Sequence, residues 1–389
     1  MALIVFWTCC GLLTYVYAVY PLLVGLLAAR FGAPPSMGTE LPTITVIVTA
    51  YNEEKCIRAK LDSLTGLDYP PELVSIVVVS DASSDSTDEI VASHDPARVR
   101  LLRLEGRRGK TACQNAAAEA ASGEILVFTD ATTRLDAAAL QRLVESFADA
   151  SVGCVAGRLV YVSDVDSATG RGGAAYWNYE VRLRVAESRL GSLIGVSGCL
   201  YGVRRSAYVP IDPQLISDFV IAMRMREQGL RTVLAADAVC YEATLDRAGH
   251  ELSMRVRVAI RSLNALCHER RFLNPLRYGR FSWQLWSHKV LRYASPLLWL
   301  GALVSNLLLA VRSPGYLILL LAQLMLIGAG AAGFLLQGRH RPLGLLGRPY
   351  YFLLTNLASL LALLRYLRGE RMVTWKPLRE GGAANSRQA

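Results

Sequence analysis

Hydrophobic residues are concentrated in four long runs, one at the start of the chain and three near its end. Residues 2–29 contain no charged side chain, and these 28 residues at 1.5 Å each are enough to cross a hydrocarbon core of about 30 Å. The later runs are 293–311, 313–338 and 349–364, each bounded by arginines. The last of them is short and spans only if Arg365 and Arg368 snorkel toward the headgroups. The pattern predicts one globular region framed by membrane helices.

The positive charges predict how the chain is oriented. Arg30 follows the first run and no lysine or arginine precedes it, which favours an uncleaved anchor with an outside N-terminus over a signal peptide. Residues 254–292 carry nine Lys or Arg and one acidic residue, so most of the net charge of +10 lies beside a membrane helix. Such basic segments face the cytoplasm and anionic lipids. We therefore expect a multi-pass protein of the cell (inner) membrane with a cytoplasmic globular domain.

The side of the C-terminus stays open at this stage. Four full spans would export the tail, yet the five Lys and Arg residues between positions 365 and 379 are typical of a cytoplasmic segment. Either the last run is re-entrant or interfacial, or the basic tail is exported. The predicted layout is an anchor (1–30), a globular domain (41–250), a basic amphipathic interfacial segment (251–292), membrane helices (293–368) and a basic tail (369–389).

Composition narrows the class of protein. Charged residues make up 19 %, below the usual ~25 %, and the mean hydropathy is +0.29, which excludes a disordered or low-complexity chain. A net positive charge suits nucleic acid, but the basic residues of 254–292 alternate with aromatic residues beside a membrane helix. We therefore expect membrane lipids and not nucleic acid as partners. The eight cysteines form neither a CxxC pair nor a zinc-like cluster, which predicts small, buried, reduced thiols.

Inside the globular region, short β-branched runs alternate with helical patterns. Strands are predicted over 44–50, 74–80, 99–104 and 124–129, and helices over 53–64, 85–92, 110–121 and 135–147. This alternation with short loops predicts a three-layer α/β domain of βαβ units. In such sheets ligands bind beyond the carboxyl ends of the strands, so the residues that follow each strand are the candidates for chemistry.

Three of the four predicted strands are followed by carboxylates. Glu53, Asp81 and Asp130 follow the first, second and fourth strands, and a Gly109-Lys110 turn follows the third. Asp85 is better explained as the N-cap of a helix. The chain has neither GxGxxG nor GxxxxGK[ST], which argues against a dinucleotide fold and a P-loop.

Five segments in order carry a family resemblance: TAYNE, VSDASSD, GRRGKTACQNAA, FTDATT and ISDFVIAMRMREQG, followed by a basic stretch and membrane helices. Together they resemble family 2 glycosyltransferases, and among them the membrane-integrated synthases of cellulose, chitin, hyaluronan and poly-N-acetylglucosamine. The resemblance covers residues 41–292 by motif. It implies a GT-A type nucleotide-diphospho-sugar transferase domain.

The resemblance also implies roles for individual residues. It makes Asp218 the general base, gives Asp81 a hydrogen bond to uracil, and assigns Asp130 and Thr132 to a divalent metal, Mg²⁺ or Mn²⁺. The residues implied to bind the donor nucleotide are Ala50, Tyr51, Glu53, Asp81, Lys110, Asp130 and Arg257. Those implied to bind the acceptor are Gly198, Cys199 and Tyr201, although a tight turn between strand pieces explains this glycine-rich segment equally well.

The chain departs from the family pattern at two motifs. Thr132 stands where the DxD motif has its second aspartate, and a neutral hydroxyl is a weaker ligand for a hard cation. Of the QxxRW motif only Arg257 is kept, with Met254 and Val258 in place of glutamine and tryptophan. In the family that motif marks processive polymerases, so processive or single transfer stays open.

These residues predict an inverting transferase that moves a sugar from a nucleotide-diphosphate sugar, expected to be a UDP-sugar, to a polysaccharide or oligosaccharide hydroxyl. A lipid acceptor, such as a glycolipid or polyprenyl phosphate, is the first alternative, and a non-catalytic sugar-nucleotide sensor is the second. Asp218 could instead serve only as a helix N-cap. In that case Glu180 or Asp212 would be the next candidates for the base.

Overall fold

The computed structural model describes residues 1–162, 168–243, 248–336 and 346–372. The chain divides into two compact units. The sheet unit comprises Pro34–Val160 and Ser192–Ala243, and the helical unit comprises Met1–Ala33, Tyr161–Gly191 and Thr244–Glu370. Each is described by itself.

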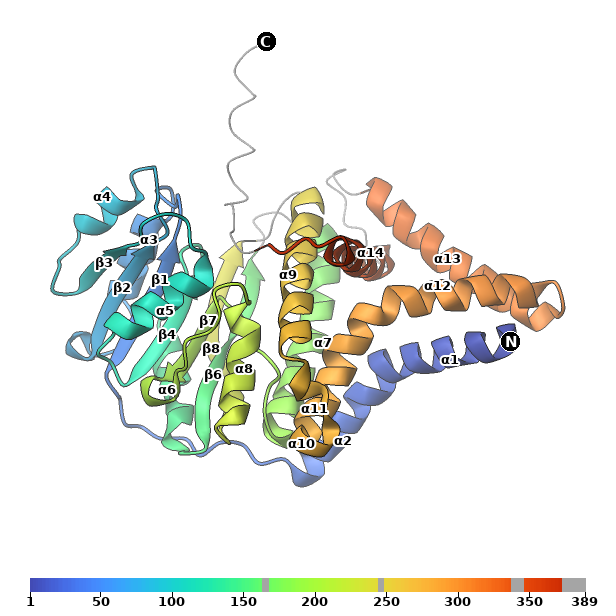
Figure 1. The fold of residues 1–389 in the computed structure, drawn as a ribbon, viewed down its shortest axis with the longest axis horizontal. Helices are drawn as coiled ribbons and strands as arrows, with labels where there is room; N and C mark the ends of the chain where they lie inside the picture. The colour runs from blue at the N-terminus through green and yellow to red at the C-terminus, as the bar shows by residue number, and fades with distance from the viewer. Residues whose placement is uncertain (163–167, 244–247, 337–345, 373–389) are drawn as a thin grey trace, which may run out of the picture. The chain divides into compact units, whose positions relative to one another are not determined.

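The sheet unit is built on an eight-stranded sheet with the order β3-β2-β1-β4-β7-β6-β8-β5 (Figure 1). The first four strands are β1 (Ile44–Ala50), β2 (Val74–Ser80), β3 (Val99–Arg103) and β4 (Ile125–Asp130), and they run parallel. All seven residues of β1 are buried, as expected for a β-branched strand in the middle of a covered sheet. The four strands predicted from the sequence are confirmed.

The other half of the sheet is antiparallel. β7 (Leu200–Arg204) pairs antiparallel with both β4 and β6 (Val152–Val162), and β5 (Arg134–Leu135) pairs antiparallel with β8 (Arg231–Ala243). The sheet is therefore mixed, whereas βαβ units alone predict a parallel one. The reversal brings residues from beyond position 190 to the ends of β1 and β4.

Helices of the sheet unit are α3 (Ile57–Thr65), α4 (Thr87–Ala92), α5 (Lys110–Ala120), α6 (Ala139–Val144) and α8 (Ser217–Glu227). α5 packs on β1 and β2, and both α6 and α8 pack on β8. The predicted helices all exist, but α6 begins four residues late because Arg134–Leu135 pairs with β8. α4 begins after Ser86, and Asp85 accepts a hydrogen bond from the Thr87 amide at 3.0 Å without being the cap residue itself.

Among the described residues, the helical unit contains four helices long and apolar enough to cross a membrane: Ala2–Phe31, Arg280–Ala310, Pro314–Leu336 and Gly347–Leu367. The first consists of α1 (Ala2–Thr14), a π-helical turn (Tyr15–Val19) and α2 (Tyr20–Phe31), and the second includes α11 (Arg280–Leu285) and α12 (Leu291–Ala310). The other two are α13 (Pro314–Leu336) and α14 (Gly347–Leu367). The unit also holds α7 (Ala168–Leu190), α9 (Ala248–His268) and α10 (Pro275–Tyr278).

Two packing contacts hold the first helix in this unit. α1 lies along α12, where Phe6 and Cys9 meet Ala302 and Leu309. α2 lies along α7, and Trp283 of α11 packs beside Tyr20. The predicted basic stretch, 251–292, runs from α9 through α10 and α11 to the first residues of α12.

A buried ion network joins three segments of the helical unit. His288 lies between two carboxylates, with Nδ1 2.8 Å from Glu187 and Nε2 2.7 Å from Glu180. Arg292 contacts Glu180 at 2.8 Å, and the Tyr20 hydroxyl donates to Glu187 at 2.5 Å. Because Glu187 has no exposed surface, the charges must satisfy one another.

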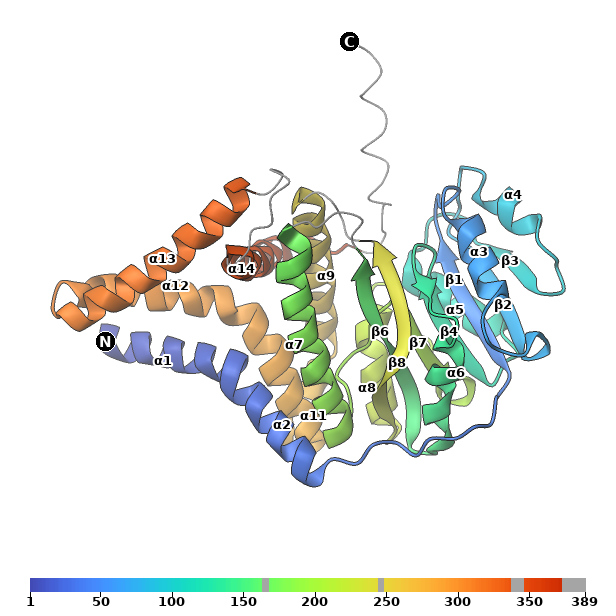
Figure 2. The ribbon, with the colours of Figure 1, turned by 180° about the vertical axis from the view of Figure 1, so that it is seen from behind.

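α14 crosses its neighbours steeply. It is seen nearly end-on in both views, whereas α1, α12 and α13 run across the picture (Figures 1 and 2). It packs on α9, where Tyr350 and Leu354 contact Leu252. The structure thus gives α14 a direction unlike that of the other three apolar helices.

Candidate active site

The candidate site lies at the carboxyl ends of the parallel strands. The register sets Thr49 of β1 beside Asp130 of β4, and Ala50 beside Ser80 of β2. The residues that follow these positions therefore meet at one edge of the sheet, where ligands of open α/β sheets bind.

Lys110, Asp130 and Asp218 converge at this edge. Lys110 begins α5, and its ammonium donates a hydrogen bond to the Asp130 carboxylate. Gly198 marks the meeting point, because a Cβ built there would lie 2.9 Å from Lys110 Nζ, 3.1 Å from Asp218 Oδ2 and 3.8 Å from Asp130 Oδ2. A glycine at this position leaves room for the three charged groups.

Lys110 is held in its charged form. Burial alone would lower the pKa of Lys110, but the negative charges of Asp130 and Asp218 outweigh burial and raise it. Two hydrogen bonds join α5, which carries Lys110, to the segment before α8, which carries Asp218. The Thr111 hydroxyl donates to the Leu215 carbonyl, and the Asn115 side-chain amide donates to the Ile211 carbonyl.

The Asp81 carboxylate is hydrogen-bonded to backbone amides of the protein. Asp81 has no exposed surface, and its carboxylate accepts hydrogen bonds from the amides of Arg108 at 2.7 Å and Gly109 at 3.1 Å. Arg107 Nε lies 3.7 Å from the same carboxylate. Asp81 therefore holds the loop that presents Lys110, and its hydrogen bond to uracil stays a prediction.

Hydrogen bonds join the loop that follows β1 to the loop that follows β2. Asn52 adopts a φ of +52°, and its side-chain oxygen accepts from the Ser84 amide at 2.9 Å. The Glu53 amide donates to the Thr87 hydroxyl at 2.8 Å. One face of the Tyr51 ring is covered by the Arg107 guanidinium, 3.4 Å from its centroid. Ala50 is buried, and its carbonyl accepts from the Asp81 amide. Tyr51 and Glu53 thus lie at the site edge, whereas Ala50 contributes only backbone.

Glu242 is a site residue that the motifs did not reveal. It lies near the end of β8, and its two oxygens accept from the Thr132 hydroxyl and from the Cys199 thiol, each at 3.4 Å. Burial raises the pKa of Glu242, and the negative charge of Asp130 raises it further. Its only sequence signal is a carboxylate near the end of a strand.

The donor set at this edge suits a hard cation. It contains the carboxylates of Asp130 and Glu242 and the hydroxyl of Thr132, and oxygen ligands are those that Mg²⁺ and Mn²⁺ prefer. No group of three or more His, Cys, Asp or Glu residues that could hold a metal occurs in the described part of the chain. A metal here would therefore need further oxygens from a substrate diphosphate, as Mg²⁺ commonly does.

Lys60 supports the site from beneath. It is 3 % exposed, and its ammonium donates to the Thr129 hydroxyl at 2.9 Å and to the Thr133 carbonyl at 2.6 Å. Burial lowers its pKa to about 8 even though Asp130 opposes this shift. Thr129 in turn donates to the Cys199 carbonyl at 2.8 Å. The sequence predicted that Lys60 lies on the apolar face of α3, but it did not predict the role of Lys60 at the site.

The expected acceptor residues separate. Gly198 lies among the three charged groups, and Cys199 is buried against Glu242. Tyr201 is 1 % exposed and stacks on Phe128 with ring centroids 4.8 Å apart. The Tyr201 ring thus belongs to the core of the sheet in this structure, and its role toward an acceptor stays a prediction.

The remaining candidates are also placed. Asp218 is the second residue of α8, whose cap residue is Ile216, so a purely N-capping role for Asp218 is wrong. Asp212 is exposed and accepts from the Gln214 amide. Glu180 belongs to the ion network of the helical unit, and Arg257 lies on α9 of the same unit.

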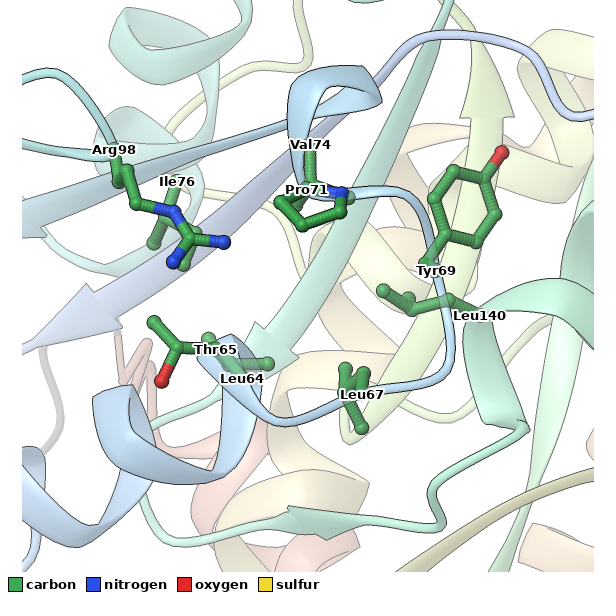
Figure 3. A pocket seen from close by; sticks show the side chains of 9 residues that line it. All are labelled: Leu64, Thr65, Leu67, Tyr69, Pro71, Val74, Ile76, Arg98 and Leu140. Atoms are coloured by element: carbon green, nitrogen blue, oxygen red, sulfur yellow. The ribbon is translucent and has the colours of Figure 1, made fainter.

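A small pocket in the sheet unit lies away from this edge. It is found beside the first residues of β2, at the amino ends of the strands (Figure 3). It is lined by Leu64, Thr65, Leu67, Tyr69, Pro71, Val74, Ile76, Arg98 and Leu140. Its lining contains no carboxylate, and it lies away from the carboxyl ends of the strands, so it is not the candidate site.

Comparison with known proteins identifies the family that part of the chain resembles. Residues 45–209 match the model of glycosyl transferase family 2. An N-acetylglucosaminyltransferase of Rhizobium sp. (strain N33) is 28 % identical over 258 residues, which cover 59 % of this chain and 57 % of that protein. A poly-beta-1,6-N-acetyl-D-glucosamine synthase of Staphylococcus aureus (strain COL) is 25 % identical over 269 residues, 65 % of each chain. The chain thus spans less than two thirds of the length of these relatives.

One solved structure resembles nearly the whole chain. It is a mannosyltransferase of Pyrobaculum calidifontis in complex with GDP-Man and Mn²⁺, with a TM-score of 0.71 and 26 % identity over 94 % of this chain and 99 % of that one. The mixed sheet agrees with that likeness. The chain carries a glycosyl transferase family 2 domain of the GT-A fold.

Proposed function

We propose that this protein transfers a sugar from a nucleoside-diphosphate sugar to an acceptor hydroxyl, with inversion at the anomeric carbon. The observation that carries the proposal is the convergence of Lys110, Asp130 and Asp218 around Gly198, at the strand ends of a family 2 domain. A group that binds phosphate and a group that accepts a proton are thereby close together.

Asp218 is the proposed general base. Its Oδ2 lies on the side of Gly198 that Lys110 and Asp130 also face, and a carboxylate there would take the proton from an attacking hydroxyl. One base without a second nucleophilic carboxylate suits a single displacement and therefore inversion. Lys110 would stay charged and would stabilise the negative charge that develops on the departing diphosphate.

Asp130 is the proposed ligand of a divalent metal, Mg²⁺ or Mn²⁺, with Thr132 beside it. Bound there, the metal would neutralise charge on the diphosphate leaving group. The P. calidifontis structure was solved with Mn²⁺, which supports this assignment. Lys110 would then share Asp130 with the cation, so the lysine must move or tilt when the donor binds.

Experiment must compare more than one nucleobase in the donor and more than one class of acceptor. The names of the relatives point to N-acetylglucosamine, and the structural neighbour to a GDP-sugar. A glycan acceptor fits the polysaccharide-forming relatives, and the four apolar helices equally suit a lipid acceptor.

We further propose that the sheet unit is cytoplasmic and that the chain crosses the membrane three times. The steep crossing and packing of α14 on α9 support an interfacial position for α14. Three crossings with an outside N-terminus return the basic tail to the cytoplasm, so the charges beyond position 364 then obey the same rule as those of 254–292. Lipid headgroups would be the partners of these basic segments.

The activity is tested with purified full-length protein in detergent. A panel of UDP- and GDP-sugars is offered with glycan or polyprenyl-phosphate acceptors, and released nucleotide and sugar products are measured. Asp218→Asn should lower transfer by roughly 10²–10⁴-fold while donor affinity stays unchanged. Asp212→Asn, an exposed carboxylate a few residues away, is the matched control and should be fully active. Donor binding without turnover on any acceptor would instead support a sensor.

The topology is tested separately in intact cells. A tag after Ala389 should be inaccessible from outside, and a thiol reagent that cannot cross the membrane should not label Cys56, which is partly exposed in the sheet unit. Labelling of the tag from outside would favour four crossings.

A further inference from the structure

A family 2 site that has threonine in place of the second acid of its DxD motif is short of one negative charge. Asp130 is the only carboxylate on the β4 turn, and one of its oxygens is already bonded to Lys110. A hard divalent cation binds through anionic oxygens, and a hydroxyl such as that of Thr132 replaces one only weakly. The missing charge must come from elsewhere in the fold.

The antiparallel edge of the sheet supplies such a group. β8 pairs with β5 so that Tyr241 stands opposite Arg134 and Cys240 opposite Leu135. Continuing this register by one residue sets Glu242 opposite Thr133, directly after the Asp130–Thr132 turn. This register brings Glu242 to the turn, where the Thr132 hydroxyl donates a hydrogen bond to Glu242 Oε1 at 3.4 Å.

The charges around Glu242 leave this site with an excess of negative charge. The groups that interact with its carboxylate are Asp130, Lys110, Thr132 and Cys199. Lys110 is the one cation among these four groups. It already pairs with Asp130, and it also interacts electrostatically with Asp218. The Lys60 ammonium beneath Asp130 is a second cation, so three carboxylates share two ammonium groups and the site still has room for a further positive charge.

We propose that Glu242 is the second carboxylate ligand of the divalent metal, in the place that the second DxD aspartate would otherwise fill. The inference rests on the proposed metal at Asp130. Because the protein then contributes only two carboxylates, the cation would bind weakly to the free enzyme and tightly once a nucleoside diphosphate adds its oxygens.

Metal binding, and not turnover, is the measurement. The full chain in detergent is titrated with Mn²⁺ with and without UDP or GDP, and free Mn²⁺ is followed by its electron paramagnetic resonance signal. Wild-type protein should bind Mn²⁺ at least about tenfold more tightly with the nucleotide. Glu242→Gln keeps an acceptor for Thr132 but lacks the charge, and it should weaken nucleotide-dependent Mn²⁺ binding at least about tenfold.

Two further variants separate ligation from structure. Thr132→Asp combined with Glu242→Gln should restore the tight binding, since it returns the charge to the β4 turn. Asp136→Asn is the matched control, because Asp136 lies in the same region and accepts from the Tyr241 hydroxyl, and it should bind Mn²⁺ as the wild type does. No rescue by the double variant would contradict the proposal.

A last measurement needs no variant. Fe²⁺ replaces the metal, and ascorbate with peroxide then cuts the backbone near the bound ion. Cleavage is expected both around residues 130–132 and around residue 242, and cleavage confined to the first segment would overturn the role of Glu242. If wild-type protein shows no nucleotide-dependent Mn²⁺ binding, the metal of the proposed function fails. If it does and Glu242→Gln binds Mn²⁺ equally well, only the present inference fails.

Discussion

Replacing Asp81 with asparagine distinguishes a nucleobase ligand from a residue that positions the Lys110 loop. In the structure the carboxylate accepts from the amides of Arg108 and Gly109 and lies 3.7 Å from Arg107 Nε. Asparagine can keep the acceptor for Arg108, but its NH₂ group would then face the Gly109 amide. One charge-assisted hydrogen bond and the pairing with Arg107 are lost, together about 2–4 kcal/mol.

That loss should appear as a lower melting temperature of the sheet unit, by roughly 5–15 °C for a unit of this size. Every tryptophan that the structure describes lies in the helical unit, so tryptophan fluorescence does not report this change. A thiol-reactive dye does, because Cys113, Cys154 and Cys240 are buried in the sheet unit. Glu72→Gln, an exposed carboxylate of the same unit, is the control and should shift the melting temperature little.

Nucleotide binding then decides between the two roles. If Asp81 acts through the loop, Asp81→Asn should weaken UDP and GDP by the same factor, because both depend on Lys110 at the diphosphate. If Asp81 contacts the base, only the natural nucleotide should lose affinity. A variant that melts like the wild type and loses UDP binding alone would refute the positioning role.

Three other changes test the site and the helical unit. Burial lowers the pKa of Lys60 to about 8, so between pH 8 and 10.5 the unfolded state binds the proton of this lysine more tightly than the folded state does. The free energy of unfolding should therefore rise with pH in that range, by up to about 3 kcal/mol. Thiol-dye melts of Lys60→Met across the same range should lack this increase. Gly198→Ala should leave the melting temperature within a few degrees but cut transfer at least tenfold, because the new methyl group displaces Lys110 Nζ, and unchanged turnover would show that the three charges need not meet there. Glu187→Gln should destabilise the helical unit by about 3–5 kcal/mol, read by tryptophan fluorescence in detergent, since it leaves His288 with only one carboxylate partner.

The sequence was sufficient wherever structure follows from local pattern. The β-branched runs gave the four parallel strands and their ends, and so predicted that Tyr51, Asp81 and Asp130 would lie at one edge. The role of each side chain at that edge was harder to predict from the sequence. Asp81 follows its strand as a ligand residue would, but the backbone amides of a loop almost thirty residues later take up its charge. Only the folded loop shows that both oxygens accept hydrogen bonds from backbone amides.

The position of Glu242 could not be predicted from the sequence at all. Its position beside Thr132 depends on the pairing of a two-residue strand, β5, with a strand about a hundred residues later. Such a short strand has no period of its own, and residues 135–147 looked helical throughout. The family match ends at residue 209, so neither Asp218 nor Glu242 lies within it. Thr132 thus looked like a weakened metal site when read along the chain. Once β8 is folded against β5, the same threonine becomes the point where a carboxylate from the other half of the sheet reaches the DxD turn. A substitution in a metal-binding motif should therefore be judged against every strand that ends at the same edge.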